Sequence, residues 1–289
     1  LEFRMAENEL VLIGTKGGPA IIKGWPNPTS SCMTIGGRLY VIDCGLGVTR
    51  GIVEAGFQLK DLSTVFITHL HSDHVVEFGS LIHSAWCSGR AGPMNCYGPK
   101  GSQALVDGMF QSFGYDIDIR IEDEGLAPLQ DLVAMTEFGE GHVFEDDVVK
   151  VSALKNIHPP IEETFALKFE FDGGSVVFSG DTAYFPPLAD FSKGADILIH
   201  EVMHAHGLDN LCEKLKDTKP NLRKHLLASH TLAADVGRIA SDANVGHLVL
   251  HHFVPTGDPD IGPEAFAEEV RKNWSGELTV GYDGVRLQF

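Results

Sequence analysis

Short runs of apolar residues, several of them alternating with polar ones, recur along the chain and predict β-strands. The clearest is FALKFEFDGGSVVFSGDT at 165–182, where apolar residues take every second position before the turn at Asp172. The turn reverses the chain, and the returning strand stops at Asp181. This segment therefore predicts a β-hairpin that places a carboxylate at the end of a strand.

Polar residues of the kind that bind metals follow the other predicted strands. These strand ends carry Asp43, the histidine-rich loop after Thr68, His158, Glu201 with His200, and His252 with His251. Helical spacing predicts helices near 52–57, 79–86 and 102–113, and a fourth helix that starts at Ser229 or Thr231. Strands followed by helices in each half predict an α/β fold of two sheets, with helices outside and the polar residues along one edge.

Length and composition fit a chain with a sizeable core. The 289 residues are 43% hydrophobic, and no apolar run approaches the roughly 18 residues of a membrane span. Residues 1–4 precede Met5 and are interpreted as a cloning remnant, with no signal peptide behind them. No linker divides the remainder, so residues 5–289 are expected to form a single domain.

Cysteine usage and charge narrow the setting and the partners. The five cysteines are scattered and form no CxxC pair, which argues against a disulfide framework and predicts a reducing cytoplasm. A formal net charge of −18 repels polyphosphate, and the lysines and arginines form no basic stripe. Nucleic acid is therefore expected to be a disfavoured partner.

The segment THLHSDH, residues 68–74, places three imidazoles and a carboxylate in one loop. Such groups are costly to bury together unless they share a partner, and for imidazole with carboxylate the usual partner is a metal ion. No cysteine stands at a candidate ligand position, so the donor set suits Zn²⁺, with Mn²⁺ or Fe as alternatives. A bound ion of this kind lowers the pKa of water to about 7, which makes hydrolysis the expected chemistry.

Four motifs in order, THLHSDH, NIHPP at 156–160, FSGDT at 178–182 and LVLHHFVP at 248–255, resemble those of the metallo-β-lactamase superfamily. VIDCG at 41–45 extends the likeness toward the amino terminus. The resemblance implies an αββα sandwich, in which two mixed sheets pack face to face with helices outside. It also implies a metal-dependent hydrolase.

Carried over position by position, the resemblance implies a dinuclear centre that holds two divalent ions. The ligands would be His69, His71 and His158 for one ion, Asp73, His74 and His252 for the second, and Asp181 as the bridge. His252 is preferred to His251 because HFVP matches the usual context of this ligand in the family, although the sequence leaves both open.

Two further segments, DILIHEVMHAHG at 196–207 and ASHTLAADVGRIA at 228–240, resemble the ribonuclease Z and arylsulfatase-like branch. The resemblance implies that Glu201 braces His230, which then approaches the scissile bond. An imidazole placed there would donate a proton to the leaving group or clamp its oxygen. The alternative for His230 is a structural place beside a helix N-cap. Asp73, His230 and Glu201 are thus the expected catalytic residues, and Asp43 is interpreted as an orienting carboxylate.

The substrate is the least defined feature. In ribonuclease Z, a long arm that binds transfer RNA is inserted in the sequence between the positions that match His158 and Asp181. Here one hairpin fills that interval. Trp25, Trp86 and Tyr184 favour a small ring-bearing substrate, such as an ester, lactone or aryl sulfate. The alternative is a ribonuclease Z-like phosphodiesterase that processes transfer RNA 3′ ends. A metal-bound scaffold without turnover is disfavoured because all seven ligand positions are intact, and a homodimer is left open.

Overall fold

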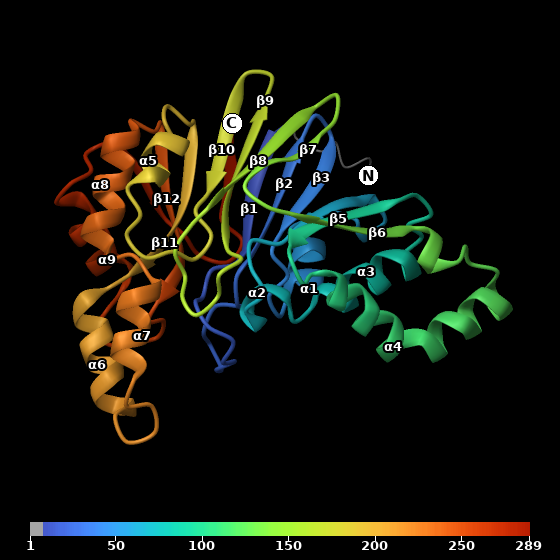
Figure 1. The fold of residues 1–289 in the computed structure, drawn as a ribbon, viewed down its shortest axis with the longest axis horizontal. Coiled ribbons are helices and arrows are strands. Elements are labelled where there is room, and N and C mark those ends of the chain that lie inside the picture. Colours follow the sequence, from blue (N-terminus) through green and yellow to red (C-terminus); the bar gives the residue numbers. More distant parts are fainter. Residues whose placement is uncertain (1–7) are drawn as a thin grey trace.

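Two seven-stranded sheets packed face to face form the centre of the molecule (Figure 1). The computed structural model describes residues 8–289, so the interpretation of residues 1–4 as a cloning remnant lies outside the described part. The first sheet has the order β14-β1-β2-β3-β4-β5-β6. Its strands are β1 (Asn8–Gly14), β2 (Ser30–Ile35), β3 (Arg38–Ile42), β4 (Leu62–Phe66), β5 (Met94–Pro99), β6 (Val133–Phe138) and β14 (Arg286–Gln288).

The second sheet comes mainly from the other half of the chain and has the order β13-β12-β11-β10-β9-β8-β7. Its strands are β7 (Gly141–Glu145), β8 (Val149–Lys155), β9 (Phe165–Phe171), β10 (Gly174–Phe178), β11 (Ile197–Met203), β12 (His247–Val254) and β13 (Glu277–Val280). Strands β9 and β10 pair as the expected hairpin, with Phe171 opposite Gly174. Strands β10, β11 and β12 run parallel, so their carboxyl ends lie at one edge.

Helices cover the outer face of each sheet (Figure 1). Those beside the first sheet are α1 (Val48–Glu54), α2 (Ser72–Val75), α3 (Phe78–Cys87) and α4 (Gln103–Ile119), and those beside the second are α5 (Pro187–Phe191), α8 (Ala233–Ala243) and α9 (Pro263–Arg271). Helices α6 (Ala205–Leu215) and α7 (Leu222–Ser229) form a hairpin that projects below the second sheet in this view. The short helical turns are η1 (Leu59–Asp61), the π-helix η2 (Arg120–Glu124) and η3 (Leu129–Asp131).

Three groups of buried apolar side chains hold these layers together. One lies between the sheets and includes Phe66 and Phe169, whose rings meet edge to face at a centroid distance of 5.1 Å. Another lies under α1 and α3 and includes Leu81, and the third lies under α5, α8 and α9 and includes Val177 and Ile239. The layer order of helix, sheet, sheet and helix confirms the predicted αββα sandwich.

The sequence located the regular elements more closely than their ends. The helix expected over 102–113 continues to Ile119 and passes into the π-helix η2. The helix expected from Ser229 or Thr231 begins at Ala233 instead, because His230 and Leu232 are extended. The α6–α7 hairpin was not predicted. No helix within residues 8–289 has the length and apolar character needed to cross a bilayer.

Candidate metal centre

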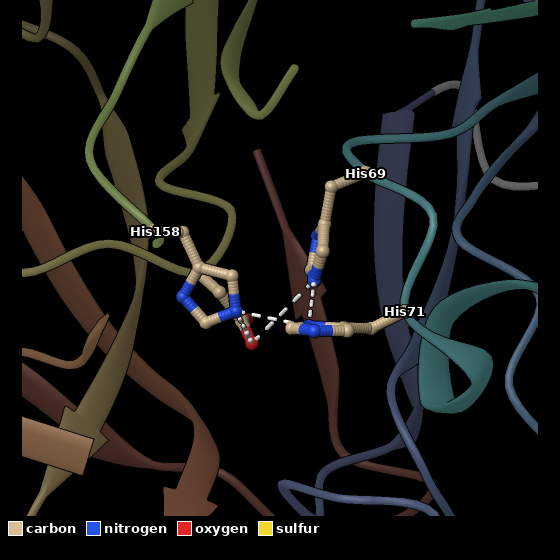
Figure 2. A group of neighbouring side chains, drawn as sticks. His69, His71 and His158 are labelled. Atoms are coloured by element: carbon tan, nitrogen blue, oxygen red, sulfur yellow. Dashed lines mark hydrogen bonds and ion pairs between the residues drawn. The ribbon is translucent and has the colours of Figure 1, made fainter. Parts of the chain in front are cut away.

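Three histidine rings from two sides of the molecule converge at the edge where the strands end (Figure 2). His69 and His71 lie in the loop between β4 and α2, and His158 lies in the loop after β8. His71 Nδ1 is 3.0 Å from His69 Nε2 and 2.9 Å from His158 Nε2. Nitrogens this close can share one ion at about 2.0–2.1 Å each with only small shifts.

Hydrogen bonds to the outer ring nitrogens fix how these rings face. His158 Nδ1 donates to the Ser229 carbonyl at 2.7 Å. His69 Nδ1 lies 3.2 Å from Thr68 Oγ1, and that hydroxyl itself donates to Asp43 Oδ2 at 2.8 Å, so the imidazole is the donor. The Nε2 lone pairs of His69 and His158 are therefore left facing the shared centre, as metal ligation requires.

A second group of ligand atoms lies beside the first. Asp73 and His74 are on α2 and His252 is on β12, with His252 Nε2 3.4 Å from Asp73 Oδ2. Asp181, in the loop after β10, connects the two groups, because its Oδ2 lies 3.8 Å from His69 Nε2 and 3.0 Å from His252 Nε2. Its Oδ1 is 3.4 Å from His74 Nε2. The seven side chains expected as ligands thus meet at one place.

An irregularity in β12 brings His252 to this place. The pairing of β11 with β12 shifts between Glu201 and Val202, which leaves His252 as the extra residue of a β-bulge. Its φ of 47° is in the left-handed region, which is uncommon for residues other than glycine. His251 is turned away, and its Nε2 donates to the Gly14 carbonyl at 2.8 Å. The bulge therefore brings His252, rather than His251, to the carboxylates.

Burial and charge set the protonation of the cluster. Burial lowers the pKa of His69 well below its usual range and that of His158 to about 4, so both rings are neutral near pH 7. Burial also opposes protonation of His252, but the carboxylates of Asp181 and Asp73 outweigh it and raise its pKa to about 10. Protonated imidazole here supplies positive charge that the buried carboxylates require, and a divalent cation would supply the same charge.

Unpaired buried atoms support this conclusion. His74 Nδ1 donates to Asp43 Oδ2 at 2.7 Å, but His74 Nε2 and both ring nitrogens of His252 lack hydrogen-bond partners within residues 8–289. Buried polar atoms without partners are costly. His74 Nε2 and His252 Nε2 lie 3.4 and 3.0 Å from Asp181 oxygens, where a shared cation would satisfy the nitrogens and the carboxylate alike. Imidazole and carboxylate donors without a thiolate form a borderline set that suits divalent metals. The residues therefore fit a metal-binding centre.

Glu201 and His230 meet at the margin of this centre. His230, between α7 and α8, has its Nδ1 3.2 Å from each carboxylate oxygen of Glu201 on β11. Glu201 is buried and accepts from the backbone amides of Thr182 and Thr231 at 2.9 and 3.3 Å, which fix its orientation. The His230 ring lies 5.1 Å from that of His158. The Glu201 carboxylate thus holds Nδ1 of His230 at the centre, where a ring nitrogen of His230 lies within 4.8 Å of ligand atoms of Asp181 and His252.

A glycine loop also touches the centre, a feature that the motifs did not indicate. The Gly18 amide donates to Asp73 Oδ2 at 2.7 Å. Lys16 is buried, and its Nζ donates to the carbonyls of Gly17 and Gly18. A Cβ at Gly17 would lie 2.8 Å from the His252 ring, so the close approach requires glycine. The signal available in the sequence was GTKGG, a lysine set between glycines at the end of a strand.

The three aromatic residues expected to contact substrate lie in separate surroundings. Trp86 is buried in the core under α3 and donates from Nε1 to the Ala127 carbonyl at 2.9 Å. Trp25 packs against Gly257, and the Arg238 guanidinium lies 5.6 Å from the centre of the Tyr184 ring. Within residues 8–289 no ring contact joins the three, so they form no common aromatic wall. Trp86 packs in the core beneath its helix. The spacing of apolar residues in the sequence does not distinguish such a core residue from one that lines a pocket.

Two comparisons with known sequences match most of the chain. A family model described as anti-Pycsar protein Apyc1 matches residues 9–233. A protein named ribonuclease Z from Mycobacterium marinum (strain ATCC BAA-535 / M) is 32% identical over 287 residues, which cover 97% of this chain and 98% of that protein.

Solved structures share the fold across nearly the whole chain. The metallo-beta-lactamase fold protein YhfI from Bacillus subtilis has a TM-score of 0.72 at 21% identity, and covers 98% of this chain and 99% of its own. The short form of human tRNase Z has a TM-score of 0.65 at 18% identity, with 97% and 98% coverage. At these identities the likeness shows the fold alone.

The sequence relatives contradict the expected small-molecule substrate and the expectation that nucleic acid is disfavoured. The match to ribonuclease Z covers almost all of both chains, so an inserted arm does not distinguish them. The net charge of −18 is a sum over the whole surface, whereas surface charges act over a Debye length of about 8 Å. Overall acidity therefore did not predict the local surface that a substrate meets.

Proposed function

The chain belongs to the metallo-β-lactamase superfamily, in the branch of ribonuclease Z and of the family described as anti-Pycsar protein Apyc1. From this we propose that it is a metal-dependent phosphodiesterase that processes the 3′ ends of transfer RNA precursors. The observation that carries the proposal is the Glu201–His230 pair beside a seven-ligand centre. A proton donor next to a metal site is what cleavage of a phosphodiester with a poor leaving group needs.

We assign two zinc ions to the centre on the basis of its ligands. His69, His71 and His158 would hold one ion, Asp73, His74 and His252 the second, and Asp181 both. Zinc ions held there would act as Lewis acids and supply a nucleophile derived from water at neutral pH. None of the proposed ligands is a cysteine, and all five cysteines are free thiols. Free thiols are consistent with an enzyme of the reducing cytoplasm.

The residues around the ions divide the remaining work. The Asp43 carboxylate holds His74, and the Gly18 amide holds Asp73, so both ligands are oriented before a substrate arrives. As water adds to phosphorus it releases a proton to solvent, and the bond from phosphorus to the leaving oxygen breaks. His230 donates its proton to that oxygen, and Glu201 stabilises the imidazolium that gives it up.

The α6–α7 hairpin offers the charge that an RNA backbone needs. Residues 205–229 hold five of the 22 lysines and arginines but three of the 40 acidic residues, a local net charge of +2 against −20 for the rest. All five basic side chains are exposed, namely Lys214, Lys216, Lys219, Arg223 and Lys224. Phosphate contacts of this kind supply affinity that does not depend on base sequence.

This hairpin is joined directly to the metal centre. Helix α7 ends at Ser229, whose carbonyl accepts from His158 and whose hydroxyl donates to the Pro159 carbonyl at 2.7 Å. His230 is the next residue. RNA lying along the hairpin would therefore reach the proton donor and the ligands without crossing the acidic remainder of the surface.

The test uses the zinc-loaded protein and a transfer RNA precursor with a 3′ trailer. We expect cleavage at the 3′ end of the mature sequence, mapped by product length. The small phosphodiester bis(p-nitrophenyl) phosphate, assayed in parallel, separates the two parts of the proposal. Hydrolysis of the small ester without RNA cleavage would refute the RNA substrate, and inactivity toward both would refute the phosphodiesterase.

A further inference from the structure

A second group of metal-type side chains lies on the helices beside the first sheet, apart from the seven-ligand centre. It consists of His83 and Cys87 on α3 and Asp116 on α4, whose ligand atoms all lie within 4.8 Å of one another. We propose that His83, Cys87 and Asp116 bind a thiophilic divalent cation, for which Zn²⁺ is the best match. This site is independent of the proposed RNA substrate.

The positions on α3 suit a shared ion. Residues 83 and 87 are four apart, so their side chains lie on one face of the helix, one turn from each other. Cys87 Sγ is 3.8 Å from His83 Nδ1 and 3.9 Å from His83 Nε2. Tetrahedral zinc with sulfur at about 2.3 Å and nitrogen at about 2.0 Å separates these atoms by roughly 3.6 Å. The helix alone thus sets a spacing close to that of two zinc ligands.

Helix α4 completes the set with a carboxylate. His83 Nε2 is 2.9 Å from Asp116 Oδ2, and the His83 ring is packed 5.0 Å from that of Phe113. The His83 side chain is 16% exposed and that of Asp116 is 46% exposed. The ring is therefore held in place, while the carboxylate has room to turn toward an ion. Water can fill a fourth position, because Cys87 is exposed.

Arg120 is the competitor for this carboxylate. Its Nε donates to Asp116 Oδ2 at 2.8 Å, and its Nη1 pairs with Glu124 at 2.9 Å. A bound cation would take Asp116 from the guanidinium, which would keep Glu124 as its partner. Burial raises the pKa of the Cys87 thiol, so binding must release the thiol proton to solvent and strengthens as pH rises.

The proposed ion would tie α4 to α3. Figure 1 shows α4 extending away from the sheets, and its last turns pass into the π-helix η2, a break in regular helix geometry. An ion at Asp116, near the end of α4, would fasten this extension to α3. Helix α3 begins three residues after α2, which carries Asp73 and His74.

The test uses the zinc-loaded protein and Co²⁺ as the probe, because cobalt bound to a thiolate gives a charge-transfer absorption band. None of the seven ligands of the main centre is a cysteine, so cobalt exchange there gives no such band. We expect about one Co²⁺ per chain to produce the band, Cys87→Ser to abolish it, and Cys212→Ser, which alters another accessible thiol, to keep it.

Arg120 gives a second, independent readout. Arg120→Gln removes a competing positive charge and is expected to tighten Co²⁺ binding about tenfold. Phosphodiester hydrolysis should be unchanged in Cys87→Ser, which shows that the variant is folded. The proposal is overturned if the wild-type protein gives no thiolate band, if Cys87→Ser keeps the band, or if Arg120→Gln weakens binding.

Discussion

At the scale of single residues, hydrogen bonds within the protein already orient most of the histidines at the centre, without a metal ion. His158, His69 and His74 each have one ring nitrogen held by an acceptor, which leaves the other nitrogen for a metal. His252 differs, because a bulge rather than a hydrogen bond presents it. The HxHxDH motif predicted four of the proposed ligands, but a β-bulge is a local irregularity that alternation of apolar residues does not encode.

His230→Ala tests the proton donor. We expect the variant to keep its metal, because none of the seven ligands changes, and to cleave RNA about 10²–10⁴ times more slowly. The loss should be smallest for substrates with good leaving groups, since these need little protonation. Metal content by mass spectrometry and kcat for two leaving groups check this, with Glu201→Gln as the matched variant. An equal loss for both leaving groups would exclude His230 as the general acid.

Burial of His200 should make the free energy of unfolding depend on pH. Burial lowers its pKa to about 4, from 6.5 in the unfolded chain, and its Nδ1 donates to the Glu201 carbonyl at 2.6 Å. The unfolded state therefore binds the proton first, so this stabilisation is complete above about pH 6.5 and is lost as pH falls toward 4, by up to about 3 kcal/mol. Denaturant unfolding of His200→Asn across this range should show a flatter decline than the wild type. Parallel curves would contradict the assignment.

At the scale of elements, most strands and the helices that cover them were predicted from periodicity. The α6–α7 hairpin was not, because few of its residues are buried and most of its charged residues are exposed, so apolar spacing gave little signal. The net charge of the whole chain, −18, gives no indication of the local positive charge on this hairpin. Lys214, Lys219 and Lys224 form no ion pair in the part of the chain that the structure describes, so they are the basic side chains most available to phosphate.

Reversing these charges tests the hairpin as the RNA-binding element. Lys214→Glu, Lys219→Glu and Lys224→Glu together should raise KM for the precursor at least about tenfold and reduce its salt dependence. Hydrolysis of the small phosphodiester should not change. A control with Lys100, Lys150 and Lys193 changed to Glu, all exposed elsewhere, alters net charge equally. If the control raises KM as much, the effect belongs to net charge and the hairpin has no special role.

At the scale of the whole molecule, the proposed ligands come from both sheets, which correspond mainly to the two halves of the sequence. His69, His71, Asp73 and His74 follow strand β4 of the first sheet, whereas His158, Asp181 and His252 belong to the second. The αββα order could be predicted because the motifs resemble those of the metallo-β-lactamase superfamily, whose members have this fold. The substrate could not, because it depends on which surfaces flank the centre, and neither composition nor total charge records that.

Removal of metal should therefore destabilise both halves together. We expect a chelator to lower the Tm while the protein still unfolds in one transition, as a single domain over residues 5–289 would. Asp181→Asn, which loses the bridging charge, should have a low Tm that the chelator does not change. Two separate transitions by calorimetry would contradict the single domain.

The central claim is that one edge of the sandwich gathers seven side chains around a pair of divalent ions. Anomalous diffraction from crystals grown with zinc tests it most directly. The account predicts two peaks about 3.5–4 Å apart, one beside His69, His71 and His158, the other beside Asp73, His74 and His252, with Asp181 between them. A single peak, or zinc bound elsewhere with these side chains unliganded, would contradict it.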